Sequence, residues 1–228
     1  MGQDEDRLKA AAANSAAALV TDGMIVGLGS GTTAAFAVDA IGARVREGLR
    51  ITGIPTSEDT AARARALGIP LTTLTEVSEI DMTIDGADEV EQGTLNLIKG
   101  HGGALLREKI VANVTKHLVI VVDESKIVQH LAAKFPVPVE VVPFGWQATS
   151  RQLEALGAKP VLRQTADAKP FISDGGHYIL DCAFGSVNAV SLAKELDHIV
   201  GLVEHGLFIG FAKAVHLASS SGVRIMVV

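Results

Sequence analysis

Short apolar segments alternate with segments of helical periodicity along the first half of the chain. The apolar run at 24–28 ends in glycines and leads into 32–48, where apolar residues recur at helical spacing. The same order is repeated by a strand pattern at 50–55, a helix pattern at 57–68 and a strand pattern at 69–74. Strands that alternate with helices predict a mostly parallel sheet with helices packed on it, which is an α/β fold.

The alternation continues as far as Asp123. Residues 79–90 are expected to form a strand that runs into an acidic loop, and residues 95–100 a further strand. A helix is predicted at 103–115 and a fully buried strand at 116–123. The first domain is therefore expected to have most of its sheet by Asp123.

Prolines mark a change of fold in the segment "KFPVPVEVVPFG". Pro136, Pro138 and Pro143 lie within eight residues of one another, roughly the length of one strand. Proline is poorly tolerated inside a central strand, because it lacks the N–H that a sheet requires. We therefore expect a domain boundary near Phe135.

Beyond this boundary the patterns predict the order strand, helix, strand, strand, helix, strand, which is typical of a ferredoxin-like α+β domain. The segments concerned are 137–142, 146–157, 160–164, 177–184, 187–199 and 201–206. The tail is expected to return to the first sheet and to end in a strand at 223–228. The predicted domains are residues 1–134 with 207–228, which carry the parallel sheet, and residues 135–206, a smaller domain related to oligomerisation.

Composition excludes several classes of protein. The apolar residues, 48% of the chain, are never gathered into a run of the roughly 20 needed to span a bilayer, and the opening segment lacks the pattern of a signal peptide. A single cysteine excludes an internal disulfide and favours a cytoplasmic protein. A net charge of -6 argues against a nucleic-acid partner, and the seven scattered histidines predict no metal site.

The loop "GLGSGTT", residues 27–33, has the features of an anion site. Its glycines let the main chain approach a phosphate, and a helix N-terminus with hydroxyl side chains follows. The loop lacks the third glycine of a dinucleotide fingerprint and the Gly-Lys pair of a P-loop. It remains compatible with the adenosylmethionine loop of a methyltransferase, or with an ordinary tight turn.

Two further loops carry charged residues. In "IDGADEVE" a bend at Gly86 would turn Asp85 and Asp88 toward one pocket, where crowded carboxylates can act as acid and base. In "KGHGGALLREK" the glycines would let the chain fold back, so that Lys99 and Glu108 face one substrate. The alternatives are a solvated acidic turn and ordinary surface residues of an amphipathic helix.

A fourth charged loop, "VVDESK", ends the strand at 116–123. Ligands of open α/β sheets bind outside the carboxyl ends of the strands, so Lys126 could contact a phosphate at the same edge as the other loops. The alternative is a solvated lysine.

Together these four loops, followed by "KFPVPVEVVP" and "ILD", resemble the ribose-5-phosphate isomerase A family over nearly the whole chain. The resemblance implies a Rossmann-like catalytic domain with a smaller α+β domain. It also implies interconversion of D-ribose 5-phosphate and D-ribulose 5-phosphate, a step of the pentose phosphate pathway, through a cis-enediolate. No metal or organic cofactor is implied, and the expected assembly is a homodimer or homotetramer.

The resemblance assigns roles to individual residues. Glu108 is the expected general base, with Asp85, Asp88 and Lys99 as further catalytic residues. The expected substrate-binding residues are Ser30, Gly31, Thr32, Thr33, Gly86, Ala87, Gly100, His101, Gly102 and Lys126, together with Lys9 in the first helix. His101 departs from the family, which usually has glycine at this position, and its role is left open.

Two alternative functions remain at this point. A methyltransferase would use "GLGSG" for adenosylmethionine but would leave Lys99 and Glu108 without a role. A non-catalytic effector domain that binds a sugar phosphate would share the phosphate loop, although the chain shows no basic DNA-binding segment.

Overall fold

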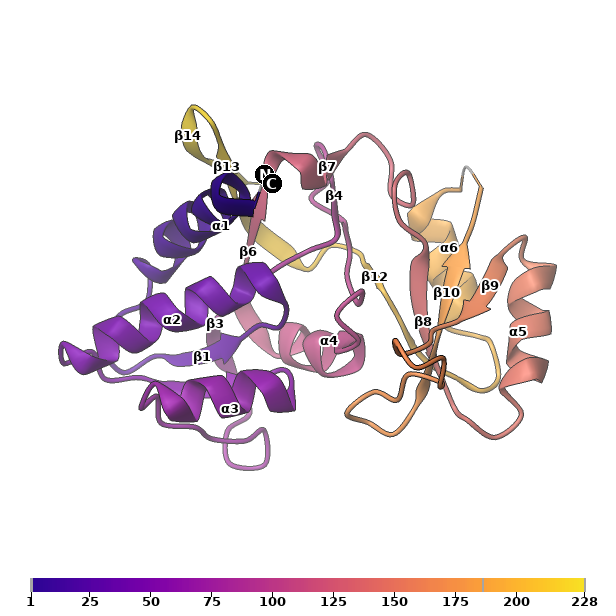
Figure 1. The fold of residues 1–228 in the computed structure, drawn as a ribbon, viewed down its shortest axis with the longest axis horizontal. Coiled ribbons are helices and arrows are strands. Elements are labelled where there is room, and N and C mark those ends of the chain that lie inside the picture. The colour runs from indigo at the N-terminus through magenta and orange to yellow at the C-terminus, as the bar shows by residue number, and fades with distance from the viewer. Residues whose placement is uncertain (1, 186, 228) are drawn as a thin grey trace.

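A six-stranded sheet forms the centre of the larger half of the molecule (Figure 1). The computed structural model describes residues 2–185 and 187–227. The strands of this central sheet, in spatial order, are β14 (Gly222–Val227), β13 (Ala212–Ser219), β6 (Thr115–Asp123), β3 (Ile80–Asp85), β1 (Ile25–Leu28) and β2 (Thr52–Pro55). All neighbours are parallel except β14, which is antiparallel to β13. The predicted parallel sheet is confirmed.

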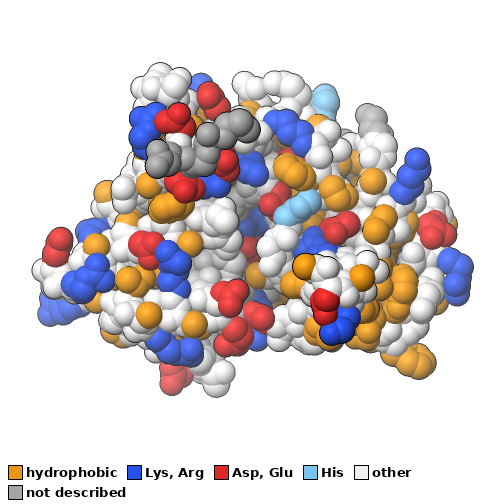
Figure 2. All heavy atoms as spheres, viewed as in Figure 1, with side chains coloured by type: hydrophobic (Ala, Val, Ile, Leu, Met, Phe, Trp, Pro, Cys, Tyr) orange, Lys and Arg blue, Asp and Glu red, His pale blue; other side chains and the backbone are white. Residues whose placement is uncertain are grey.

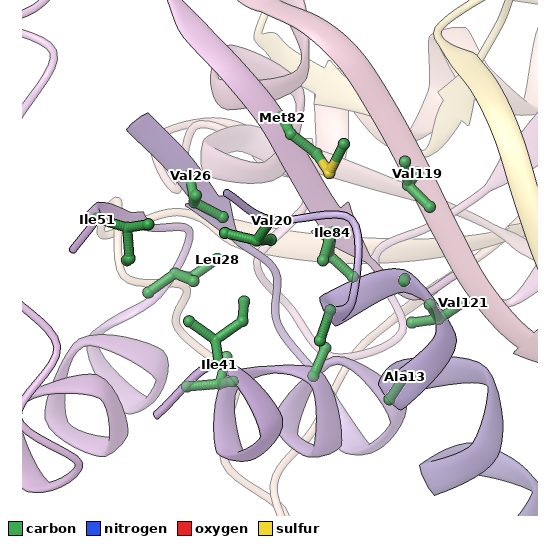
Figure 3. Packing of buried hydrophobic residues seen from close by; sticks show 14 of the residues in the cluster. Ala13, Val20, Val26, Leu28, Ile41, Ile51, Met82, Ile84, Val119 and Val121 are labelled. Atoms are coloured by element: carbon green, nitrogen blue, oxygen red, sulfur yellow. The ribbon is translucent and has the colours of Figure 1, made fainter. Parts of the chain in front are cut away.

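Helices cover both faces of the central sheet because β6 is apolar on both sides. Val119 and Val121 pack in one cluster with residues of α1 (Gly2–Ala17) and α2 (Thr32–Arg46), as Figure 3 shows. Leu118, Ile120 and Val122 point to the opposite face, where α4 (Leu105–Asn113) packs through Ala112. Alternation with period two along a strand produces this division. The remaining helix, α3 (Glu58–Ala66), packs beside α2 and β2.

A second sheet, with four short strands, lies between the two halves of the molecule. This bridging sheet contains, in spatial order, β12 (Leu207–Phe208), β5 (Leu97–Ile98), β4 (Glu89–Glu91) and β7 (Ile127–Val128). The short helix η1 (Glu124–Lys126) connects β6 to β7. Three of the predicted site segments lie directly beside strands of the bridging sheet: the acidic loop before β4, Lys99 after β5, and Lys126 before β7. The bridging sheet therefore brings them to one edge of the central sheet.

The second half of the molecule is built on a four-stranded antiparallel sheet. This small sheet contains β11 (Leu202–His205), β8 (Val137–Val141), β10 (Tyr178–Ala183) and β9 (Lys159–Leu162) in spatial order, with α5 (Trp146–Ala155) and α6 (Ala189–Leu196). The chain order is strand, helix, strand, strand, helix, strand, so the ferredoxin-like prediction is confirmed. We propose domain boundaries at residues 1–134 with 207–228 and at 135–206, which the separate sheets support.

Two details of the sequence prediction are wrong. Residues 69–74 form no strand, since Leu71 makes only an isolated bridge to Gly53. The tail contributes two strands to the central sheet rather than one, because β13 inserts beside β6 before β14 turns back, and its first strand, β12, joins the bridging sheet instead; Val228 lies outside the described residues. Within 2–185 and 187–227, no helix is long and apolar enough to cross a membrane.

Candidate active site

The loop between β1 and α2 presents a helix N-terminus with free donors. Gly31 is the N-cap residue and has φ 88°, a conformation that favours glycine, and no side chain in the described part of the chain caps this helix end. Thr32 and Thr33 form the first turn of α2. Unpaired N–H groups and the helix dipole at such an end attract anions, so this turn suits a phosphate.

The Ser30 side chain supports this loop from behind. Its hydroxyl lies 2.7 Å from Thr56 Oγ1, 2.8 Å from Ser57 Oγ and 3.2 Å from Thr60 Oγ1. The Thr60 hydroxyl in turn donates to the Gly29 carbonyl at 3.0 Å. The serine predicted to add a hydroxyl donor for the ligand therefore fixes the loop against the start of α3.

Asp85 connects the phosphate loop to the catalytic residues. Its Oδ1 accepts hydrogen bonds from the Ser30 N–H at 3.1 Å and the Gly86 N–H at 2.7 Å. This approach needs a glycine at position 29, because a Cβ there would lie 2.3 Å from the same oxygen. The carboxylate at the end of β3 is thus enclosed by the neighbouring loop.

The glycine loop turns the chain back between β5 and α4. Gly100 has φ 109°, and a Cβ at this position would lie 2.9 Å from Leu105 Cβ and 3.3 Å from Pro138 Cβ. Glycine is required here both by conformation and by space. The turn brings Lys99 Nζ to 3.3 Å from Glu108 Oε1, the pair that the sequence predicted to face one substrate.

Lys99 lies between two buried carboxyl groups. Its Nζ is 3.0 Å from Asp85 Oδ2 and donates to the Gly86 carbonyl at 2.6 Å. The side chains of Lys99, Asp85 and Glu108 are 3%, 2% and 6% exposed. Glu108 Oε2 is also buried and has no hydrogen-bond partner in the part of the chain that the structure describes. One ammonium ion therefore faces two carboxyl groups, and one carboxyl oxygen is left for a ligand.

Burial raises the pKa of Glu108 to about 8, despite the opposing effect of the Lys99 ammonium ion, and the Asp85 charge adds to the rise. Burial also raises the pKa of Asp85, although Lys99 and two main-chain N–H donors oppose it. Burial lowers the pKa of Lys99, but both carboxylates outweigh this effect, so its pKa lies above the ordinary value. The pKa values of both carboxyl groups therefore lie above their ordinary values, and Glu108 keeps one oxygen without a partner among the described residues.

Asp88 and His101 hold the glycine loop in place. Asp88 Oδ2 accepts a hydrogen bond from the His101 N–H at 3.0 Å. The imidazole lies away from the cavity, with Nε2 3.2 Å from the Pro136 carbonyl oxygen and the ring edge-on to Phe135. His101 is not among the residues with positive φ, so the departure from glycine causes no backbone strain.

A cavity of about 100 Å³ collects most of the residues singled out from the sequence. It is lined by Lys9, Ser30, Gly31, Thr32, Thr33, Gly86, Ala87, Asp88, Lys99, Gly100, Gly102, Glu108 and Lys126. Of the predicted site residues, only Asp85, behind Lys99, and His101 do not line it. A larger hollow of about 490 Å³ shares Ser30, Gly31, Thr32 and Gly102 with the cavity. Figure 2 shows this face of the molecule hollowed between its two halves, with charged side chains in the hollow.

Two residues beside the site were missed by the sequence analysis. The Phe208 ring lies 5.6 Å from Lys99 Nζ and 4.9 Å from Lys109 Nζ. Arg163 donates from Nη1 to the carbonyl oxygens of Gly100 and His101. No local pattern could identify either residue, since both reach the site from distant parts of the chain. Across residues 2–185 and 187–227, no three His, Cys, Asp or Glu side chains are grouped to hold a metal ion.

Fold and site together define an α/β enzyme in which an anion-binding helix N-terminus lies beside a buried lysine and a buried carboxylic acid. The model of the family ribose 5-phosphate isomerase A (phosphoriboisomerase A) matches residues 52–222. The ribose-5-phosphate isomerase A of Synechococcus sp. (strain JA-3-3Ab) is 56% identical over 223 residues, 97% of either chain. The chain belongs to the ribose 5-phosphate isomerase A family.

Solved structures are similar over the whole chain. Ribose 5-phosphate isomerase A from Methanocaldococcus jannaschii has a TM-score of 0.95 at 41% identity and covers 98% of this chain and 100% of its own. A D-ribose-5-phosphate isomerase in complex with phospho-erythronic acid has a TM-score of 0.94 at 36% identity, over 97% of this chain and 98% of its own. These similarities leave the methyltransferase and effector-domain interpretations without support.

Proposed function

We propose that this protein interconverts D-ribose 5-phosphate and D-ribulose 5-phosphate in the pentose phosphate pathway. The observation that carries the proposal is the buried Glu108 Oε2, which has no hydrogen-bond partner among the described residues and belongs to the side chain beside Lys99, in a cavity that also contains an anion-binding helix N-terminus. The isomerisation needs a base for a carbon-bound proton, an electrophile for the adjacent oxygen and a fixed phosphate. The family to which the chain belongs supports the same activity.

The phosphate would bind at the start of α2. Thr32 and Thr33 line the cavity at this end, and Lys9 of α1 and Lys126 of η1 line the same cavity from other elements. These contacts involve a group that does not change during the reaction. Their binding energy therefore serves to place C1 and C2 of the sugar beside Glu108.

Glu108 would move the proton between the two carbons. In the forward direction its carboxylate removes the C2 proton, and the electron pair of the C–H bond forms the C1–C2 double bond of a cis-enediolate. The C1 carbonyl oxygen takes the negative charge, next to the Lys99 ammonium ion and the glycine loop. Glu108 then returns the proton to C1, while the proton of the C2 hydroxyl passes to the C1 oxygen, so that C2 becomes the ketone and C1 carries a hydroxyl. Positioned proton transfer contributes about 10² to 10⁴-fold, and stabilisation of the oxyanion supplies much of the remainder.

The two aspartates would have different tasks. Asp88 lines the cavity with one carboxylate oxygen not engaged by His101, so it is the candidate for proton exchange with the sugar oxygens during ring opening. Asp85 lies behind Lys99 and orients the ammonium ion. The lysine supplies the electrophile, so the proposed mechanism needs neither a metal nor an organic cofactor.

The related isomerase structure with phospho-erythronic acid is consistent with this chemistry. A four-carbon phosphorylated acid presents a carboxylate where the enediolate carries its two oxygens. A cavity that stabilises the enediolate should bind such an acid more tightly than inorganic phosphate.

We also propose that the protein is cytoplasmic and that it assembles as a homodimer or homotetramer.

A direct assay tests the proposed activity. The purified protein is incubated with D-ribose 5-phosphate, and ketose formation is followed by its absorbance and by NMR. Steady production of D-ribulose 5-phosphate is expected, with the reverse reaction reaching the same equilibrium. Absence of turnover by folded protein would refute the proposal.

A further inference from the structure

Arg163, the residue after β9 in the small sheet, contacts the glycine loop of the active site. Its Nη1 donates to the Gly100 carbonyl at 2.9 Å and to the His101 carbonyl at 3.1 Å. Both carbonyl groups belong to the glycine loop that separates Lys99 from Glu108. A side chain 62 and 63 positions away in sequence therefore holds the outer side of this loop.

The guanidinium group of Arg163 is itself held in one orientation. Nε donates to Asp181 Oδ2 at 3.0 Å, and Nη2 pairs with Asp181 Oδ1. The two side chains are only 13% and 24% exposed. A two-point contact between a guanidinium and a carboxylate fixes the plane of the donor group as well as its position. The paired strands β9 and β10 thus aim Arg163 at the loop.

The contacts of Arg163 act on two successive peptide groups. The peptide after Gly100 donates its N–H, that of His101, to Asp88 on the inner side. In the peptide between His101 and Gly102, the Gly102 N–H has no acceptor in the described part of the chain. Gly102 lines the cavity. A carbonyl that accepts from a cation makes the N–H of the same peptide a stronger donor, because hydrogen bonds in a chain polarise one another.

The segment between β9 and β10 also contacts the end of the glycine loop, through Phe171. A Cβ at Gly103 would lie 2.5 Å from the Phe171 ring, which leaves no room for a side chain at this position. The Phe171 ring lies 5.9 Å from the Arg163 guanidinium carbon. Arg163 and Phe171 therefore hold the glycine loop between β9 and the cavity.

We propose that Arg163, oriented by Asp181, is a positioning residue of the isomerisation: it fixes and polarises the two loop peptides whose N–H groups face Asp88 and the enediolate oxygen. This inference rests on the proposed function. It predicts that loss of Arg163 weakens stabilisation of the enediolate and leaves phosphate binding unchanged, because the hydrogen bonds of Arg163 among the described residues go to Asp181, Gly100 and His101 and not to residues 27–33.

The test compares Arg163→Met with the unaltered protein. We expect kcat to fall about 10-fold, less than the roughly 10²-fold loss typical of a direct oxyanion donor, with KM for ribose 5-phosphate within about two-fold. The inhibition constant of phospho-erythronic acid should rise by about the same factor as kcat/KM falls. That of inorganic phosphate should stay unchanged. Asp181→Asn should shift the same quantities in the same direction by a smaller factor.

Two controls separate positioning from general damage. Arg151→Met removes an exposed arginine of α5 and should leave all four constants unchanged. Arg163→Lys keeps the positive charge and one donor and should restore part of kcat. If Arg163→Met does not fold, Asp181→Asn and Arg163→Lys carry the same comparison.

The outcomes are distinguishable. Folded Arg163→Met with unchanged kcat, or with equal losses of phosphate and phospho-erythronic acid binding, would overturn the positioning role. Turnover of ribose 5-phosphate by the unaltered protein would in that case leave the proposed function intact. An unaltered protein without turnover would instead refute the proposed function.

Discussion

Glu108→Gln is expected to stabilise the protein while it removes the activity. The buried site contains two carboxyl groups and one ammonium ion, with Lys99 Nζ 3.0 Å from Asp85 and 3.3 Å from Glu108. The amide can still accept the hydrogen bond from Lys99. The substitution leaves one carboxylate to one ammonium ion, so the buried charge becomes balanced.

The pKa of Glu108 gives the sign and the size of this effect. Burial raises it from 4.5 to about 8, so between these values the folded protein keeps a proton that the unfolded chain releases. The contribution to stability is complete below 4.5 and is lost as pH rises through about 8. At about 1.4 kcal/mol per pKa unit, the gap corresponds to about 5 kcal/mol at most. We expect the variant to gain between about 1 and about 5 kcal/mol at about pH 9, and much less at about pH 5.

Urea unfolding of both proteins at the two pH values measures the gain, with Glu154→Gln on the exposed side of α5 as the matched control. The kcat of Glu108→Gln should fall at least about 10²-fold, with affinity for ribose 5-phosphate nearly intact. For the unaltered protein, kcat/KM should decline as pH falls through about 8, where the free base is protonated. A variant that is less stable at both pH values, or that keeps near-normal kcat, would refute the reasoning.

Three other predictions concern binding, mechanism and acid stability. Thr33→Val should weaken inhibition by inorganic phosphate and raise KM with little change in kcat; an unchanged phosphate inhibition constant would place the phosphate elsewhere. Exhaustive chelation should leave activity intact, and the product formed in heavy water should carry deuterium at C1. The deuterium content is partial if Glu108 returns the same proton that it removed. An activity that is lost to the chelator and restored by a divalent ion, with no deuterium in the product, would contradict the enediolate route. Burial and the charge of Lys109 lower the pKa of His205 to about 4, so its stabilising contribution, complete above 6.5, is lost as pH falls toward 4. His205→Gln should flatten this part of the stability profile, and a profile with the original slope would contradict the neutral, buried histidine.

The sequence was sufficient for the main features of the fold and for the composition of the cavity. Alternating strand and helix patterns predict a parallel sheet, and loops after parallel strands meet at one edge of that sheet. For this reason the charged and glycine-rich loops could be placed together before their geometry was known. Elements without strong periodicity were harder: β13 was missed, and 69–74 is a loop rather than a strand.

The sequence could not show which individual side chains line the cavity and which hold other site residues in place. It placed Asp85 and Asp88 in one pocket, but Asp85 lies behind Lys99, and the Ser30 hydroxyl faces the start of α3. Arg163 and Phe208 could not be identified at all. Local patterns constrain neighbours within a few residues, whereas Arg163 contacts a loop 63 positions away in the sequence. Only the packing of the sheets against one another determines which distant side chains meet.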